Sequence, residues 1–453
     1  MKKMRAPGGI VGFVVMFASV VGTALPSTAA ALGGSEPLPP DQPSASANGL
    51  SEGVITAAED WTEFRGPTGQ GHSGTQKLPI AWSVTNNVIW RKAIPGLGWS
   101  SPVVARGRIY LTTGIISSNK GPSLCALALE TATGRMLWQS EVFRPTETES
   151  EPLNSKNSHA SPTPVVAGDR LYVHFGHNGT ACLDLTGKIL WRNNTLRYKP
   201  FHGSGGSPIL VEGKLVYSAD GTSDPFVVAL DAKTGQAVWK KTRATQAKNK
   251  FSFSTPLLIT VNGRREIISA GSGVVSALDP KDGREIWRVR YGEGYSVVPR
   301  PVYGQGLLFL TTGYDRAEIL AIRPDGEGDV TDTHVAWRRT KGAPYTPSLL
   351  VVNTEVYAVD DKGLASCLDA KTGMVHWQQR VQGNYSASPV YADGRIYLQN
   401  EEGTGIVLKP GRAFTAVATN KVHERCLASC AVAEGAVFLR TAGALYRIGE
   451  ESP

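Results

Sequence analysis

Eight side chains at comparable places along the sequence could together bind a ligand. Most are aromatic or histidine residues, and each lies near the start of a stretch that alternates between apolar and polar residues. Rings combined with a few polar groups suit a sugar, a peptide or a small planar molecule. The alternative is that the rings fill a narrow channel. The candidates are Trp99, His159, His202, Phe253, Tyr295, Arg300, Tyr345 and Tyr385.

Common catalytic motifs are missing from the sequence. The nucleophile motif GxSxG, the phosphate-binding motif GxxxxGK(S/T) and the zinc motif HExxH do not occur. His72 stands next to Ser73, but a lone His beside Ser is far more often incidental than catalytic. The sequence therefore predicts no catalytic residue and favours a protein without catalysis of its own.

Acidic residues crowd one turn, where oxygen atoms at alternate positions would suit Ca²⁺. The order of an EF-hand loop is not met, so we predict no metal site and no cofactor there. The acidic residues are Asp325, Glu327, Asp329 and Asp332.

The five cysteines do not form a recognisable framework. Cys125, Cys182 and Cys367 are interpreted as small buried residues on strands. Cys426 and Cys430, four apart on a predicted strand, would lie about 13 Å apart at 3.3 Å per residue. That separation is too long for a disulfide, and the spacing fits no zinc pattern.

Regularly spaced tryptophans indicate which elements position these residues. Seven of the ten are separated by 48, 53, 48, 48, 50 and 40 residues, a period typical of a propeller or a solenoid. They are predicted to link neighbouring repeats, because an indole buries a large area and needs a partner for its N–H. The seven are Trp90, Trp138, Trp191, Trp239, Trp287, Trp337 and Trp377.

Each repeat contains a tight turn that leads to its tryptophan. The clearest copies are ALETATGRMLW (128–138), CLDLTGKILW (182–191), ALDAKTGQAVW (229–239), ALDPKDGREIW (277–287) and CLDAKTGMVHW (367–377). Two further strands, usually beginning with Ser-Pro or Thr-Pro, precede each turn. Four strands in about 48 residues are typical of a propeller blade. The candidate ligand residues would then face the central funnel.

The count of repeats predicts an all-β, eight-bladed β-propeller with four-stranded antiparallel blades. Six blades end on a tryptophan, and a seventh, from about residue 385 to 422, lacks it. The last blade has three strands within 426–450. Its fourth strand is expected in residues 87–94, which would close the ring from the N-terminal side.

The N-terminal residues have the composition of an export signal followed by a linker. Residues 1–31 contain a positive start, an apolar run of 16 residues and an Ala-rich cleavage site. Residues 32–60 are rich in Gly, Pro, Ser and Ala, as in a disordered linker. Residues 61–450 are predicted to form the propeller. Without residues 1–31 the net charge falls from +8 to +5, and no dense basic run indicates a nucleic-acid partner.

The turn-and-tryptophan motif resembles the bacterial PQQ-like (quinoprotein-type) β-propeller repeat family over residues 61–450. The quinone-dependent dehydrogenases of that family hold PQQ and Ca²⁺ over the axis, often beneath a disulfide between adjacent cysteines. This chain has no Cys-Cys pair, and no residue is assignable as a calcium ligand or catalytic Asp. The BamB-like members are non-catalytic lipoproteins, but here the first cysteine is Cys125.

The sequence thus favours an exported scaffold, periplasmic or extracellular, that binds an envelope protein or another extracytoplasmic ligand. A monomer without a membrane span after signal cleavage is expected. The alternative is a PQQ-dependent dehydrogenase.

Overall fold

The computed structural model describes residues 60–117, 120–146 and 153–450. The predicted signal (1–31) and all but the last residue of the predicted linker (32–60) lie outside the described residues. The regular elements of the described part are β-strands, apart from one helix, the short 3₁₀ turn Gly176–Asn178. Within these ranges, no helix is long and apolar enough to cross a membrane.

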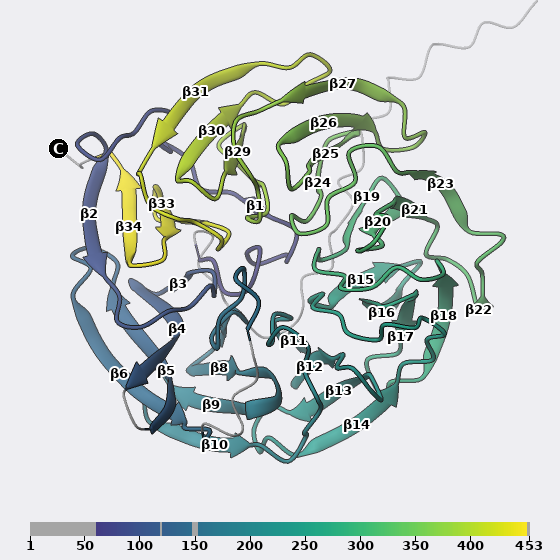
Figure 1. Ribbon diagram of the computed structural model, residues 1–453, viewed down its shortest axis with the longest axis horizontal. Coiled ribbons are helices and arrows are strands. Elements are labelled where there is room, and N and C mark those ends of the chain that lie inside the picture. Colours follow the sequence, from purple (N-terminus) through teal and green to yellow (C-terminus); the bar gives the residue numbers. More distant parts are fainter. Residues whose placement is uncertain (1–59, 118–119, 147–152, 451–453) are drawn as a thin grey trace, which may run out of the picture. The chain divides into compact units, whose positions relative to one another are not determined.

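Eight four-stranded antiparallel units form the predicted propeller (Figure 1). We number the blades in chain order from the inner strand outward. Blade one contains β3 (Val103–Ala105), β4 (Arg108–Ser117), β5 (Lys120–Glu130) and β6 (Met136–Phe143). Blade two contains β7 (Val165–Ala167), β8 (Arg170–His174), β9 (Thr180–Asp184) and β10 (Ile189–Asn193). Blade three contains β11 (Ile209–Val211), β12 (Lys214–Ala219), β13 (Phe226–Asp231) and β14 (Ala237–Thr242). Blade four contains β15 (Leu257–Val261), β16 (Arg264–Gly271), β17 (Val274–Leu278) and β18 (Glu285–Arg290).

The remaining blades repeat this order. Blade five contains β19 (Val302–Gly304), β20 (Leu307–Thr311), β21 (Ile319–Ile322) and β23 (Val335–Arg339). Blade six contains β24 (Leu350–Val352), β25 (Glu355–Val359), β26 (Leu364–Asp369) and β27 (Val375–Arg380). Blade seven contains β28 (Val390–Ala392), β29 (Arg395–Gln399), β30 (Thr404–Leu408) and β31 (Ala416–Lys421). Blade eight contains β32 (Ala431–Ala433), β33 (Ala436–Arg440) and β34 (Ala444–Gly449), with β2 (Val88–Ala93) as its outer strand.

Two short strands add to these blades in parallel. The strand β1 (His72–Ser73) pairs with the inner strand of blade seven, and β22 (Gly328–Asp329) pairs with the outer strand of blade four. The addition of β1 brings the segment before the first blade to the propeller axis.

The core is divided among the interfaces between blades. Separate apolar clusters fill the spaces between consecutive blades, such as blades one and two or blades four and five. The cluster around blade eight also contains Trp61 and Trp82 from the N-terminal segment. Because the blades form a ring, they share no single core. Each pair of facing blades therefore buries apolar side chains in its own interface.

Six of the seven periodic tryptophans reach the turn of the next blade. Each indole N–H donates to a backbone carbonyl at 2.9 to 3.2 Å. The pairs are Trp90–Thr131, Trp138–Leu185, Trp191–Ala232, Trp239–Pro280, Trp337–Ala370 and Trp377–Gly411. The turn glycine also lies on the ring: a Cβ at Gly235, where φ is +75°, would come within 2.5 Å of Trp191.

Trp287 also lies between two blades, but its N–H partner differs from that of the other six. Its N–H donates to Oε2 of Glu266 within its own blade at 2.8 Å, although the ring is buried against blade five. Blade five lacks the turn glycine at the matching place, since Gly326 lies against Val330 and His334 instead. The indole therefore finds its acceptor on β16, two strands away in the same blade.

The cysteine prediction needs one correction. The five cysteines, all within the described ranges, are free and buried. However, Cys426 and Cys430 lie in the segment before β32 rather than on a strand. The residues around them form the connection between blades seven and eight.

Candidate functional site

A belt of hydroxyl groups surrounds the propeller axis. In seven blades the residue two positions before the inner strand is Ser or Thr, and it is Arg300 in blade five. The backbone N–H at this position donates to the hydroxyl at the same position of the next blade, at 2.9 to 3.0 Å in six cases, which form two runs of three interrupted between Thr255 and Arg300. We call the seven residues the hydroxyl belt: Ser101, Thr163, Ser207, Thr255, Ser348, Ser388 and Ser429.

Arg300 interrupts the belt because its side chain binds the N-terminal segment. Its guanidinium donates to the carbonyl of Phe64, to Oε1 of Glu63 at 3.0 Å and to the carbonyl of Pro256. Only 2% of the Arg300 side chain is exposed. Burial raises the pKa of the Glu63 carboxyl, and the charge of Arg300 opposes that rise. The sequence pattern predicts Arg300 at the central funnel. This placement is wrong, because the side chain is buried and does not face an open funnel.

Residues 61–73 cross the axis, and we call them the axial plug. Trp61 exchanges two backbone hydrogen bonds with Val104 of blade one. On the opposite side, Arg65 donates to the carbonyl of Leu349, and an Nε2 atom of His72 lies 2.8 Å from the carbonyl of Val351. The plug thus joins inner strands from both sides of the ring and closes one end of the channel.

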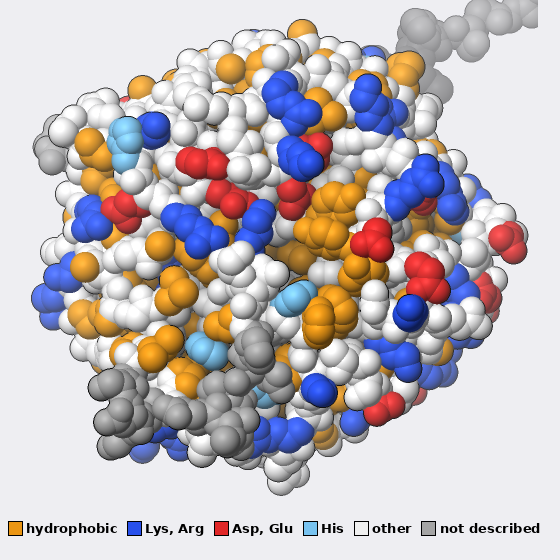
Figure 2. All heavy atoms as spheres, in the orientation of Figure 1, with side chains coloured by type: hydrophobic (Ala, Val, Ile, Leu, Met, Phe, Trp, Pro, Cys, Tyr) orange, Lys and Arg blue, Asp and Glu red, His pale blue; other side chains and the backbone are white. Residues whose placement is uncertain are grey.

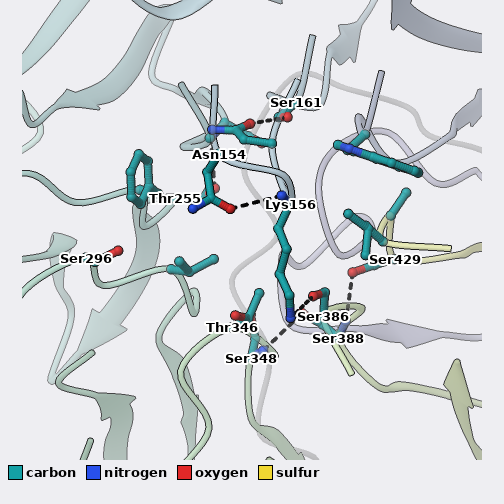
Figure 3. Close-up of a pocket in the computed structure, with 18 of the residues that line it drawn as sticks. Asn154, Lys156, Ser161, Thr255, Ser296, Thr346, Ser348, Ser386, Ser388 and Ser429 are labelled. Atoms are coloured by element: carbon teal, nitrogen blue, oxygen red, sulfur yellow. Dashed lines mark hydrogen bonds between the residues drawn. The ribbon is translucent and has the colours of Figure 1, made fainter. Parts of the chain in front are cut away.

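A cavity of about 360 Å³ lies on the axis, with Phe64 of the plug among its lining residues. All seven belt residues line it. In the view along the axis, hydrophobic side chains gather around a hollow near the centre of the face (Figure 2). The close-up places Thr255, Ser348, Ser388 and Ser429 around this space (Figure 3). The plug and the belt therefore make a pocket that is open at one end.

An aromatic wall, formed by rings of blades three to six, lies on one side of the cavity. Centroids are 5.4 Å apart for Phe251 and Tyr295, 6.4 Å for Tyr295 and Tyr314, and 4.3 Å for Tyr314 and Tyr345. Phe253 adjoins Phe251 at 6.1 Å. The hydrogen bond from Tyr295 to Asp315 raises the pKa of the Tyr295 phenol.

The opposite side of the mouth is formed by the segment 153–161, which precedes blade two. Lys156 extends from it toward Ser386 (Figure 3) and pairs with Oε1 of Glu401 in blade seven at 2.6 Å. Arg425 donates to the carbonyl of Ser155, and its guanidinium lies 5.7 Å from the Trp99 ring. These contacts hold the segment against blades seven and eight.

The structure brings together only some of the predicted ligand residues. Trp99, His202, Phe253 and Tyr295 line the cavity. Tyr345 lies behind them, stacked on Tyr314.

Two further predicted residues lie elsewhere. His159 faces a separate small pocket with His177 and Phe175, and burial lowers the pKa of its imidazole. Tyr385 is fully buried in the cluster between blades six and seven, so its placement in the funnel is corrected. Both precede an inner strand, but the connecting segments turn their side chains into the blade interfaces.

Sequence reasoning missed the belt, as well as Phe251, Tyr314 and Lys156. The Ser-Pro and Thr-Pro pairs had marked only the starts of strands, whereas their hydroxyl residues contribute to the belt. The contact between Lys156 and Glu401 spans 245 residues, so no local pattern could indicate it.

The acidic turn does not gather its carboxylates. Asp325 pairs with His334, Glu327 with Arg264, and Asp329 with Arg290. Within the described ranges, no group of three or more His, Cys, Asp or Glu residues could hold a metal ion. Of the described residues that line the axial cavity, none is Asp or Glu.

The fold and the cavity define the chain as an eight-bladed β-propeller with a pocket on its axis. The sequence model of one family, described as outer membrane protein assembly factor BamB, matches residues 44–142, 126–350 and 326–413. The chain therefore belongs to this family.

Relatives within and beyond this description match parts of the chain. BamB of Bordetella pertussis is 28% identical over 243 residues, 53% of this chain and 56% of that protein. BamB of Yersinia pestis is 25% identical over 226 residues, 44% of this chain and 53% of that protein. Methanol dehydrogenase (cytochrome c) subunit 1 of Paracoccus denitrificans is 27% identical over 33% of this chain and 27% of that protein. The chain thus spans little more than half of each relative's length, or less.

Two solved structures share the fold. BamB from Moraxella catarrhalis superposes with a TM-score of 0.55 at 12% identity, covering 81% of this chain and 98% of that one. A europium-containing methanol dehydrogenase gives a TM-score of 0.53 at 13% identity, covering 85% and 90%. The same propeller therefore occurs in an assembly factor and in an enzyme, so function must be argued from the site.

Proposed function

We propose that this chain is an exported, non-catalytic scaffold of the cell envelope that binds a partner at the mouth of the axial cavity. The observation that carries the proposal is the pocket itself, which combines an aromatic wall with a polar belt. Aromatic rings and a few polar groups in a preformed cavity are typical of a recognition site. Membership of the BamB family supports a protein as the partner.

The rim of the cavity supports recognition of a partner rather than of a free solute. Tyr314 is 37% exposed and Phe201 is 43% exposed, so two rings of this region remain open to solvent. The ring centroids of Phe201 and Phe251 are 4.4 Å apart. Phe201 thus continues the aromatic wall onto the outer surface. Exposed aromatic rings contribute much of the energy at protein interfaces.

A quinone-dependent dehydrogenase is the alternative function. Its Ca²⁺ would need several oxygen ligands, usually carboxylates. The described lining residues do not fit this requirement, because they offer hydroxyls and amides but no Asp or Glu. Lys156 is the lining cation, and it is already paired with Glu401. We therefore propose neither PQQ nor Ca²⁺ as a cofactor.

Crosslinking tests the scaffold. A photoreactive amino acid replaces Tyr314 at the cavity mouth or, as a matched control, Val417 on the outer strand of blade seven, which is 48% exposed. We expect a discrete envelope protein to crosslink at position 314 and not at 417. The same yield at both positions, or none at 314, would count against the mouth as the contact surface.

Enzyme assay tests the alternative. Purified protein is incubated with PQQ and Ca²⁺, and dye reduction is followed with alcohols and sugars. We expect no turnover above a sample without PQQ. Substrate-dependent reduction would overturn the scaffold proposal.

A further inference from the structure

We propose that the hydroxyl belt is a binding site for a carboxylate carried on an apolar or aromatic body. The inference rests on the proposed function in one respect, that the axial cavity is the binding site, and it adds the chemistry of the ligand.

The belt hydroxyls keep their own hydrogens free, whereas several other lining hydroxyls do not. A hydroxyl has one hydrogen to donate and two lone pairs to accept. Six belt hydroxyls accept a backbone N–H from the preceding blade. Within the described residues, no belt hydroxyl has a protein acceptor for its own hydrogen. A ring of O–H donors therefore faces the cavity.

Hydroxyls nearer the mouth are already used as donors. Ser161 donates to Asn157, Thr346 donates to Asp361 at 2.6 Å, and Ser386 donates to Glu401 at 2.6 Å. Most of the hydroxyl hydrogens left for a ligand within the described lining therefore belong to the belt.

Buried positive charge lies behind the belt. Arg300 is paired with the carboxylate of Glu63, whereas Arg65 has no carboxylate partner within the described residues. Arg65 is 1% exposed, and within the described residues its Nε and Nη1 atoms have no hydrogen-bond partner. It reaches the carbonyl of Leu349, the residue after a belt serine, at 2.8 Å. Burial lowers the pKa of Arg65 to about 9.

A second buried guanidinium lies behind the belt at blade one. Arg440 is 1% exposed and donates to Ser100 and to the carbonyl of Thr112, with no carboxylate among its partners in the described residues. A buried charge without a counter-charge is costly. A negative charge in the adjacent cavity would reduce that cost for Arg65 and Arg440 together.

The arrangement of hydroxyls and buried guanidinium groups around the cavity favours a carboxylate over a more highly charged group. Phosphate is usually bound by direct contact with Arg or Lys. Here the lining cation Lys156 is already paired with Glu401, and Arg65 and Arg440 are not among the lining residues. The contacts left for a ligand are neutral hydroxyls, which suit one delocalised negative charge. The rings of Trp99, Phe251 and Phe253 line the same cavity and suit an apolar body.

Two sources supply this chemistry: a free carboxylic acid and the C-terminal carboxylate of a peptide. Calorimetry with the full chain in EDTA compares 3-phenylpropionate with 3-phenylpropanamide. It also compares a short peptide ending in phenylalanine with its C-terminal amide. Each acid should bind at least about tenfold more tightly than its amide, because hydrogen bonds to a charged group are the stronger ones. Binding of only one acid identifies the source.

Ser101→Ala is the cleanest variant. The Ser101 hydroxyl accepts no backbone N–H within the described residues, so its removal orphans no amide. We expect about a tenfold loss of affinity for the acid and little change for the amide. Ser276→Ala, the matched control, removes a hydroxyl that is not part of the cavity lining and already donates to Glu285, and it should leave the acid-to-amide ratio unchanged.

Equal affinity for acid and amide would overturn the inference, as would equal losses for both ligands in Ser101→Ala. Failure of both acids to bind, together with retained crosslinking at position 314, would overturn the carboxylate site and leave the scaffold standing. Absence of crosslinking at position 314, together with acid-selective binding, would overturn the scaffold and leave the carboxylate site standing.

Discussion

Replacement of Arg300 by Met should release the axial plug. Arg300 is the one belt position that carries a charge, and it forms a 3.0 Å ion pair with Glu63. Met keeps an unbranched stem but leaves the Glu63 carboxylate, with 16% of its side chain exposed, without its partner. Breaking a buried pair costs about 3–5 kcal/mol. The remaining exposure of Glu63 places the expected loss near the lower end, about 3 kcal/mol.

The loss should depend on pH with a defined sign. Burial raises the pKa of Glu63 above its ordinary value, and Arg300 opposes this rise. A carboxyl with a raised folded-state pKa stabilises the fold below its unfolded pKa, and this contribution is lost as the pH rises through the folded value. Removing Arg300 raises the pKa of Glu63 further. The variant should therefore be least stable, relative to the natural protein, at neutral pH and recover toward pH 4.

Urea unfolding at pH 7 and pH 4 measures both effects. Adding Glu63→Gln to Arg300→Met removes the stranded charge and should recover part of the loss at pH 7. Arg135→Met is the matched control, because its pair with Glu130 lies at the surface and should contribute little to stability. A loss below about 1 kcal/mol for Arg300→Met at pH 7, or no recovery with Glu63→Gln, would refute the reasoning.

Three further changes test other contacts. Trp191→Ala should cost about 3 kcal/mol in urea unfolding, because a large ring between blades is replaced by a cavity, and a loss below about 1 kcal/mol would contradict the linking role. Gly235→Ala should lower the melting temperature, since the added Cβ would lie 2.5 Å from the Trp191 ring at a φ of +75°, and an unchanged melting temperature would exclude that clash. Burial lowers the pKa of His174 to about 3, so the natural protein should lose stability as the pH falls below about 6.5, by up to 1.4 kcal/mol per unit. His174→Gln should weaken this dependence, and an identical pH profile in the variant would contradict it.

The repeat predicted the blades because their information is local. A strand, a glycine turn and a tryptophan recur within about 48 residues, and six indoles reach the turn of the next blade. Trp287 lies between two blades as well, but its N–H partner could not be predicted, because it depends on the neighbouring blade, where the turn glycine is missing. The sequence around Trp287 itself contains no sign of this difference.

The cavity was only partly predictable, because it depends on contacts between distant residues. Trp99 and Tyr295 were found from their places before inner strands. Arg300 occupies such a place too, but its partner Glu63 lies 237 residues away in the axial plug. Tyr385 shows the same limit, since a small change in the connecting segment decides between the axis and the blade interface.

The pairing of β2 with β34 also means that β2 is synthesised long before the strand with which it pairs. Arg91 and its partner Tyr446 are 355 residues apart, and synthesis at about 5–20 residues per second separates them by about 20–70 seconds. During that interval the hydrogen-bonding edge of the first blade strand has no partner. An open edge invites pairing with other chains, and charged side chains discourage it. Arg91 and Lys92 lie in the middle of β2, where they can protect the strand that waits longest for its neighbour.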